Sequence, residues 1–283
     1  MGKKFKMMMG GSAKPFDRPT RNEADWSNYK ESDIEFFNSN HDRMVEIMRM
    51  ISPKSVSDKT KVRIGSSNDG GYVMLDEILK SGKIAYSIGI GNTIKFEEAV
   101  EALGYKIWMY DHTVNGKKFK NENRTIFKIG IAPADAGKYK TLSTMIKDNG
   151  HENEENMVLQ MDVEGAEWEV LSRIDPDVLS KFSIMNLEIH WMNTMFARPD
   201  TTEMIDKSFQ ALTKNHTVFH VHANNWCGYY EMKDKPPLAE VLEISLVKND
   251  LVNLVSCNEE FPGPLDSPNK KGEPDINLGD FQW

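Results

Sequence analysis

The sequence predicts an α/β protein with a mostly parallel sheet of seven strands and helices on both of its faces. Between residues 83 and 214, short apolar segments alternate with amphipathic ones, which is the pattern of β-α-β units. The last two apolar segments have no convincing helix between them, so they predict an antiparallel hairpin at the end of the sheet. A content of 39% hydrophobic and 28% charged residues is ordinary for a globular protein.

The strands are expected where apolar and β-branched residues cluster, at residues 83–90, 106–110, 125–131, 157–161, 182–190, 217–222 and 241–248. Helical spacing of apolar residues predicts helices at 94–103, 141–149, 167–173 and 202–214. A further N-terminal helix is expected from Asp33 to Ile51, because the Ser52-Pro53 pair interrupts the helical pattern there.

The chain divides into four expected regions. A flexible arm is expected over residues 1–24, because this stretch is basic and lacks periodicity. An N-terminal helical segment should follow over residues 25–60, and the main α/β domain over residues 61–261. Residues 262–283 are rich in Pro, Gly, Asn and Asp, so they predict an irregular tail.

Composition also limits the partners and the compartment. Cys227 and Cys257 do not form a disulfide framework, which favours a reducing compartment, and the start of the chain lacks the hydrophobic region of a signal peptide. No apolar run approaches the roughly 20 residues that a membrane span needs. A net charge of −8 disfavours a nucleic-acid partner. A cytoplasmic protein without membrane contact is expected, and its oligomeric state is not indicated.

A ligand-binding turn is expected after the first strand of the main domain. Ser87-Ile-Gly89-Ile-Gly91 leads from that strand into a helix, and glycines there let the backbone approach a ligand. Asp111 ends the next strand, 20 residues beyond Gly91, where a carboxylate can accept both hydroxyls of a ribose. A tight turn and a capping aspartate are the alternatives that need no ligand. Ile94 stands where a dinucleotide fingerprint has its third glycine.

Acidic residues gather around the end of a later strand. Asp162-Val-Glu164-Gly-Ala-Glu167 follows an apolar segment, and open α/β sheets bind ligands at such strand ends. If the next strand lies beside it, Glu188 and His190 should come close to Asp162. Asp162 and Glu188, with His222, could then hold Mg²⁺ or Mn²⁺, or His190 or His222 could act as a general base. A hydrogen-bonded network that only shapes a pocket is the third possibility.

Two further motifs suggest a place for an acceptor. His220-Val-His222-Ala-Asn-Asn-Trp226 puts both histidines on one face of a strand, and its tryptophan beside two amides suits a sugar. A satisfied core cluster is the alternative. Asp69-Gly-Gly-Tyr72 is either an ordinary turn or a lid over the pocket.

The motif at residues 162–171 resembles the central motif of FkbM-type methyltransferases, which use S-adenosylmethionine. Other pieces agree in order, including Asn68–Val73, Ser87–Gly91, Tyr110-Asp111, Asn186–His190, His220–Trp226 and Leu265–Asn269, so that the resemblance covers about residues 60–270. It implies a Rossmann-like class I methyltransferase domain. One departure is Ser87, where methyltransferases usually carry an acid, and Glu97 on the following helix is expected to replace it.

The resemblance implies an S-adenosylmethionine-dependent O-methyltransferase that acts on a hydroxyl of a sugar, sugar nucleotide or glycan. The expected cofactor-binding residues are Asp69, Ser87, Gly89, Gly91, Glu97, Asp111 and Asp162, and the expected catalytic residues are Asp162, Glu188, His190 and His222. Two rival readings stay open, namely an NAD-linked sugar oxidoreductase or epimerase, and a nucleoside-binding module without catalysis. The absence of a third glycine argues against the first of these.

Overall fold

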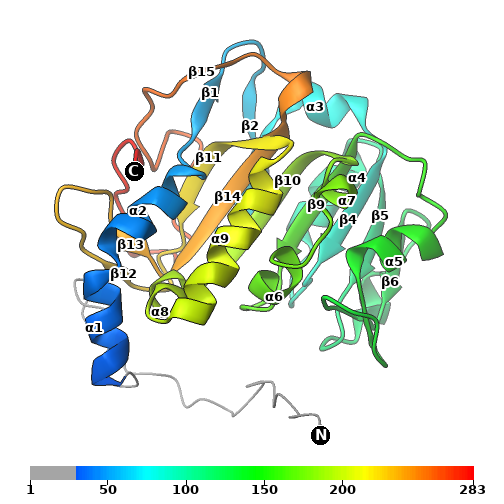
Figure 1. Ribbon diagram of the computed structural model, residues 1–283. Helices are drawn as coiled ribbons and strands as arrows, with labels where there is room; N and C mark the ends of the chain where they lie inside the picture. Colours follow the sequence, from blue (N-terminus) through cyan, green and yellow to red (C-terminus); the bar gives the residue numbers. More distant parts are fainter. Residues whose placement is uncertain (1–29) are drawn as a thin grey trace, which may run out of the picture.

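A computed structural model describes residues 30–283, so the arm predicted over residues 1–24 and the first part of the helical segment lie outside the described residues. The central feature is a sheet of seven strands in the order β11-β14-β10-β9-β4-β5-β6 (Figure 1). These strands are β4 (Ile84–Ile88), β5 (Lys106–Tyr110), β6 (Arg124–Phe127), β9 (Met157–Asp162), β10 (Phe182–His190), β11 (His216–Ala223) and β14 (Val241–Lys248).

The direction of the strands confirms the predicted fold class. Neighbours from β10 to β6 are parallel, whereas β14 lies between β10 and β11 and is antiparallel to both. The last two strands therefore form the expected hairpin, with β14 inserted into the sheet. This is the Rossmann-like sheet of class I methyltransferases.

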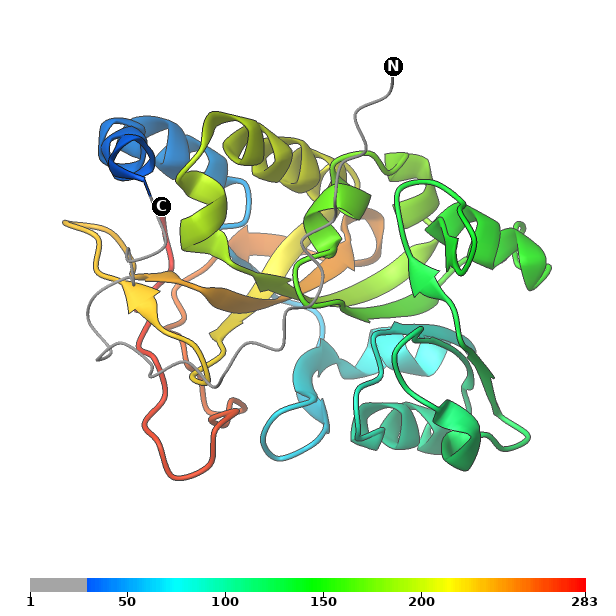
Figure 2. The ribbon, with the colours of Figure 1, turned by 90° about the horizontal axis from the view of Figure 1, so that it is seen from below.

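Helices cover the sheet on both sides (Figure 2). One side carries α1 (Glu31–Ser39), α2 (His41–Arg49), α5 (Leu142–Asp148), α6 (Glu167–Leu171), α7 (Pro176–Leu179) and α9 (Pro199–Thr213), with α8 (Met192–Phe196) beside α9. The other side carries only α3 (Asp76–Ser81) and α4 (Lys95–Ala102), together with a β-hairpin and the C-terminal tail. No helix within residues 30–283 is long and apolar enough to cross a membrane.

Short strands and 3-10 turns complete the structure. Hairpin β2 (Lys61–Gly65) and β3 (Gly71–Leu75) packs against α4, and β1 (Lys54–Val56) pairs with β15 (Leu254–Ser256). The remaining short elements are β7 (Gly130–Ile131), β8 (Tyr139–Lys140), β12 (Tyr229–Tyr230), β13 (Leu238–Ala239), η2 (Gly116–Phe119) and η3 (Asn249–Leu251). None of the short strands before residue 80 is predicted above.

The predicted helix from Asp33 to Ile51 is in fact two helices, and this expectation was wrong. The break lies at Asn40, whose φ of −99° and ψ of 15° are not helical. Phe37 and Met44 are buried on either side of the break, so both helices present an apolar face to the same core. The apolar spacing survives a one-residue break, which is why the sequence pattern reads as continuous.

The tail at residues 262–283 contains no helix within the described chain, and its pairing is limited to a bridge between Phe261 and Gly279. It nevertheless packs closely, because Phe281 and Trp283 are buried in the main core. Arg49 donates a hydrogen bond through Nε to the carbonyl of Trp283 at 3.0 Å. The tail therefore lies along the molecule. Most of it runs on the side of the sheet that has few helices, and its end reaches α2 on the other side (Figure 2).

Candidate functional site

The face of the sheet with few helices becomes polar toward the carboxyl ends of its strands. Ala85, Val158, Ile184 and Val247 form an apolar row across four neighbouring strands. The next row across the strands is polar and comprises Ser87, Gln160, Asn186, Ser245 and His220. The row after that comprises Asp162, Glu188, Glu243 and His222. Two consecutive polar rows inside a sheet are incompatible with an apolar cover, so they mark the candidate site.

Asp162 and Glu188 are direct partners in the register of β9 and β10, as the sequence predicts if these strands are neighbours. Glu243 of β14 lies on the other side of Glu188. Asp69, in the turn between β2 and β3, completes the group, because single oxygens of Asp69, Glu188 and Glu243 lie within 4.8 Å of one another. We call Asp69, Asp162, Glu188 and Glu243 the acidic cluster.

Burial and mutual repulsion favour the protonated forms of two of these carboxyl groups. Glu188 is only 5% exposed, and this burial holds its pKa well above its usual range. The negative charges of Asp162 and Glu243 raise it further. Burial also raises the pKa of Asp162 to about 7, although the positive charge of His190 opposes this. Asp162 therefore changes charge near neutral pH.

Some oxygens of the acidic cluster lack a donor within the described chain. Oδ1 of Asp162 is buried and has no hydrogen-bond partner. Glu188 accepts one hydrogen bond, through Oε1 from the side-chain amide of Asn224 at 2.6 Å, and this leaves Oε2 without one. Buried acceptors without partners are uncommon in folded proteins, so Oδ1 of Asp162 is suited to a group that a ligand brings.

His190 is held in place by Glu167, which is fully buried. One oxygen of Glu167 accepts from the backbone N–H of His190 at 2.6 Å and lies 3.0 Å from its Nδ1, and the other accepts from the N–H of Gly165 at 2.9 Å. Burial lowers the pKa of His190, but the hydrogen bond and the charge of Glu167 outweigh it and raise that pKa to about 9. Nε2 of this imidazolium lies 3.7 Å from Asp162 and 3.9 Å from Glu188.

This arrangement changes the role expected for His190. A general base must be unprotonated, and an imidazole with a raised pKa holds its proton at neutral pH. The carboxylate of Asp162, with a pKa near 7, is better suited to take a proton than His190 is. His190 instead supplies a positive charge beside the carboxyl groups of the acidic cluster.

His222 likewise does not suit the expected roles of metal ligand and base. Its Nδ1 lies 2.9 Å from Glu243 and its Nε2 lies 3.0 Å from Asp275 in the tail, so both ring nitrogens have carboxylate partners. Burial lowers the pKa of His222, but the charge of Glu243 and the bond to Asp275 raise it to about 10. The ring is therefore an imidazolium that connects β11 and β14 to the tail. His220, two residues earlier on β11, contacts Asp266 of the tail through Nε2 at 2.8 Å, but its Nδ1 has no partner and burial lowers its pKa.

The two amides predicted to bind a sugar are occupied by the protein itself. Asn224 donates to Glu188 and accepts from the N–H of Trp226 at 2.9 Å. Asn225 accepts from the N–H of Lys270 at 2.7 Å and donates to carbonyls of the tail, of which Pro274 is at 3.1 Å. Both amides thus position other groups, whereas Trp226 itself is exposed.

The glycine turn between β4 and α4 lies against the acidic cluster. Gly89 has a φ of +85°, and a Cβ at this position would come within 1.6 Å of the carbonyl oxygen of Asp162. Gly91 has a φ of +60°, and a Cβ there would meet no heavy atom within 4 Å. The first glycine is thus required by the packing of the turn, whereas the second borders open space.

Asp111 binds the same turn from the end of β5. Its Oδ2 accepts from the N–H of Ile90 at 3.0 Å, and its Oδ1 accepts from the N–H and hydroxyl of Thr113 at 2.7 and 2.6 Å. Burial raises the pKa of Asp111, but these hydrogen bonds outweigh it and lower that pKa below its usual range. The carboxylate is therefore ionised and fixed beside Gly91, where the sequence predicts a ribose.

Glu97 lies where the sequence expects it to substitute for the acid missing at Ser87. Its Oε1 is 2.5 Å from the hydroxyl of Ser87, which also lies 2.9 Å from Oε1 of Gln160. Burial raises the pKa of Glu97 to about 7. Because a hydroxyl has one proton, both contacts are satisfied when Glu97 is protonated and donates to Ser87, and Ser87 donates to Gln160.

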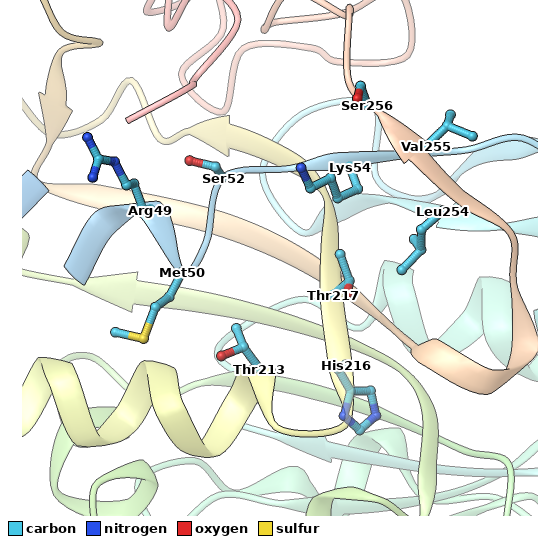
Figure 3. A pocket seen from close by; sticks show the side chains of 10 residues that line it. All are labelled: Arg49, Met50, Ser52, Lys54, Thr213, His216, Thr217, Leu254, Val255 and Ser256. Atoms are coloured by element: carbon cyan, nitrogen blue, oxygen red, sulfur yellow. The ribbon is translucent and has the colours of Figure 1, made fainter. Parts of the chain in front are cut away.

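A well-formed hollow lies away from this site. A cavity of about 460 Å³ lies at the amino end of β11, where Arg49, Lys54, His216 and Val255 line it (Figure 3). None of the site residues predicted from the sequence lines it. The acidic cluster lies toward the other end of β11, so we assign the chemistry to the cluster and not to this hollow.

Sequence reasoning missed several residues of the site. Glu243 has no recognisable motif, and Asp275 lies in a tail that the sequence predicts only as irregular. Asp266 and Asn269 belong to the piece Leu265–Asn269 of the resemblance, but no role was predicted for them. A signal for Glu243 was available, because a carboxylate between Leu242 and Ile244 in a strand buried on both faces requires a partner.

Comparisons with known proteins do not add a family. No protein-family model matches the chain, and no curated protein matches it. Among solved structures, a candidate hemolysin from Streptococcus thermophilus has 11% identity and a TM-score of 0.34, and the alignment covers 64% of this chain and 72% of the hemolysin chain. A candidate RNA methyltransferase from Pyrococcus horikoshii has 15% identity and a TM-score of 0.32, with coverage of 61% and 80%. The plantazolicin methyltransferase in complex with S-adenosylhomocysteine has 10% identity and a TM-score of 0.29, with coverage of 79% and 93%. TM-scores this low do not establish a common fold, so the class I methyltransferase architecture is assigned from the strand order.

Proposed function

We propose that this chain is an S-adenosylmethionine-dependent O-methyltransferase that acts on a sugar hydroxyl. The observation that carries the proposal is the contact between the glycine turn and the acidic cluster, in which Gly89 lies against the backbone of Asp162. A nucleoside-binding turn and a group able to accept a proton thus lie at one edge of the sheet. The resemblance of residues 162–171 to FkbM-type methyltransferases supports the same function.

The residues around the turn fit the proposed cofactor. Asp111 is ionised and its oxygens already accept from the backbone of the turn and from Thr113, so in this proposal it fixes the turn against which a ribose lies, and Gly91 leaves space beside it. When bound, S-adenosylmethionine supplies an electrophilic methyl group. An NAD-linked reaction is less well supported, because Ile94 is buried in the core beside α4 where a dinucleotide site has its third glycine.

Asp162 is the proposed proton acceptor. Methylation of a hydroxyl releases its proton, and a carboxylate with a pKa near 7 is suited to take it, which typically contributes about 10²–10⁴-fold to a rate. The neighbouring imidazolium of His190 stabilises the ionised carboxylate before transfer. Glu188, which holds its own proton, can donate a hydrogen bond to the acceptor through Oε2.

A divalent cation is the alternative way to activate the hydroxyl. The convergence of Asp69, Glu188 and Glu243 within 4.8 Å favours it, since hard oxygen ligands suit Mg²⁺ or Mn²⁺. These three residues replace the set of Asp162, Glu188 and His222 expected from the sequence, because His222 has no free ring nitrogen. Such an ion would lower the pKa of a bound hydroxyl, and Glu188 would have to ionise to hold it.

Cofactor binding is tested by calorimetric titration of S-adenosylhomocysteine and, separately, of NAD. We expect S-adenosylhomocysteine to bind and NAD not to bind. Gly91→Ala should weaken binding at least tenfold, because the added methyl group occupies space assigned to the ligand. Gly137→Ala is the matched control, since Gly137 has a φ of +58° and also borders open space, in a loop after β7. Equal affinity in the two variants would remove Gly91 from the site, and tighter binding of NAD would refute the proposed reaction.

A further inference from the structure

Two tryptophans at the carboxyl edge of the sheet are exposed to solvent. Trp191 and Trp226 are 44% and 41% exposed, and they are the two exposed aromatic side chains among the large hydrophobic residues of the described chain. Large aromatic residues are normally well buried, and groups of exposed ones often belong to binding sites. Trp191 follows the last residue of β10, and Trp226 lies three residues beyond the end of β11.

The backbone keeps Trp191 exposed at a cost in free energy. Its φ of 63° and ψ of 35° lie in the left-handed region, which bulky residues rarely adopt. The ring lies beside Gly165, where a Cβ would come within 3.0 Å of two ring atoms. The glycine that follows Glu164 therefore makes room for this ring next to the imidazole of His190, whose centroid is 6.3 Å from that of Trp191.

Glu240 connects the two loops that carry the tryptophans. Its carboxylate accepts from the side-chain amide of Asn193 at 3.0 Å and from the N–H of Gly228 at 3.1 Å, and its carbonyl accepts from the N–H of Met192. Only β14 separates β10 from β11, so their ends lie roughly 10 Å apart. A gap of this order between the two loops has room for a six-membered ring.

Each tryptophan is also connected to the acidic cluster. The backbone N–H of Trp226 donates to the side chain of Asn224, and Asn224 donates in turn to Glu188. Trp191 directly follows His190, whose Nε2 lies 3.9 Å from Glu188. Asp162 ends β9, the strand beside β10, and pairs with Glu188 next to the loop that carries Trp191. The unpartnered Oδ1 of Asp162 requires a donor, such as a hydroxyl or ammonium group, whereas Glu188 holds its own proton and can donate a hydrogen bond.

The charge of this edge discriminates between possible acceptors. Asp69 has no ion-pair partner within residues 30–283, and Asp162 and Glu164 have only His190, which is already paired with Glu167. The ammonium group of Lys270 lies 5.4 Å from the ring centroid of Trp226, but this ammonium group is also 3.7 Å from a carboxylate oxygen of Glu273, which offsets its charge. Arg63 is occupied by the carbonyls of Ser66, Asn68 and Leu265. A phosphate or carboxylate would meet excess negative charge here.

We infer that Trp191 and Trp226 form the two walls of the acceptor site, and that this site takes a sugar ring without negative charge, with an amino sugar preferred. The inference rests on the proposed function, and it narrows the acceptor to neutral or positively charged rings. Aromatic walls contact the C–H faces of such a ring, while Oδ1 of Asp162 accepts from one of its hydroxyl or ammonium groups and the protonated Glu188 donates to a hydroxyl. Sugar nucleotides, which carry phosphates, are excluded as acceptors.

The test uses three hexoses that differ in charge: glucosamine, glucose and glucose 6-phosphate. Each hexose is titrated into the full chain, which is saturated with S-adenosylhomocysteine, in a buffer that contains EDTA to remove divalent metal ions. Binding is followed by calorimetry and tryptophan fluorescence. We expect glucosamine to bind about tenfold more tightly than glucose, and glucose 6-phosphate at least tenfold more weakly than glucose. Binding of glucose 6-phosphate as tight as that of glucose would refute the charge selection.

Variants test the two walls. Trp191→Ala and Trp226→Ala should each weaken glucosamine binding at least tenfold, whereas Trp191→Phe and Trp226→Phe should retain it within about threefold. Val255→Ala is the control, because Val255 is also an exposed apolar residue but lies in β15 at the other end of the sheet. Alanine variants that bind glucosamine like the parent would overturn the assignment, as would binding that requires added Mg²⁺. If S-adenosylhomocysteine itself does not bind, the proposed function fails instead, and fluorescence titration without it still decides whether the walls bind a sugar.

Discussion

The buried pair of Glu167 and His190 allows a quantitative prediction for Glu167→Gln. The pKa of His190 is raised from 6.5 to about 9 at a side chain that is 5% exposed. At 1.36 kcal/mol for each pKa unit, this rise corresponds to up to about 3 kcal/mol of stability. Glutamine preserves the shape of the side chain but removes the charge that holds the imidazolium.

The pH dependence of this contribution follows from its sign. A histidine whose pKa is raised in the folded state binds its proton more tightly there, so its contribution is complete below pH 6.5 and is lost as the pH rises through 9. Glu167→Gln should therefore destabilise the protein more at pH 6 than at pH 10, by up to about 3 kcal/mol. A further loss of about 1 kcal/mol at both pH values is expected from the hydrogen bond to Gly165.

Urea denaturation at the two pH values measures this difference. Glu169→Gln is the matched control, because Glu169 lies on the same helix and is exposed. It should change the free energy of unfolding equally little at both pH values. If Glu167→Gln has the same effect at pH 6 and at pH 10, the reasoning about the imidazolium is wrong, and His190 is neutral in the folded protein.

Three other predictions concern the glycine turn, the proton acceptor and the metal. Gly89→Ala should lower the free energy of unfolding by about 3 kcal/mol or more, because the added Cβ overlaps the carbonyl oxygen of Asp162. A melting temperature equal to that of the parent would show instead that the turn can shift. Turnover should rise with pH through about 7 as Asp162 loses its proton, and Asp162→Asn should abolish this rise while S-adenosylhomocysteine still binds; a rise that persists in the variant assigns the base elsewhere. Dialysis against EDTA should leave turnover unchanged if Asp162 acts as the base, whereas loss of turnover that Mg²⁺ or Mn²⁺ restores would assign activation to the ion at Asp69, Glu188 and Glu243.

The parallel part of the fold could be predicted because its signals are local. Strands such as Phe182–His190 are buried on both faces, so apolar residues such as Ile184, Leu187 and Ile189 predominate in segments of the correct length. The pairing of Asp162 with Glu188 then follows from the neighbouring positions of two parallel strands. The hairpin at residues 61–75 was missed because it is one layer away from the sheet and its strands are short, and because β2 is partly exposed whereas β3 is buried.

The roles of the histidines could not be predicted for a different reason. Whether His222 is a base, a metal ligand or an imidazolium depends on what approaches its two nitrogens, and the partners Glu243 and Asp275 come from 21 and 53 residues away. The same holds for Glu167, whose place at the start of a helix favours an acid but does not reveal that it holds His190. Local pattern indicates which residues carry chemistry, whereas long-range contacts decide their protonation.

The residues proposed for the cofactor and those proposed for the acceptor lie on different parts of the fold, and this has an evolutionary consequence. The turn around Gly89 and Asp111 belongs to the sheet. In contrast, Asp69 comes from a hairpin turn, and the irregular tail supplies Asn269, which contacts Glu243, and Asp275, which contacts His222. Such segments can change in length and sequence without disturbing the strands. Selection for a new acceptor could therefore exchange the hairpin turn and the tail as a module, while the half of the molecule assigned to the cofactor stays as it is.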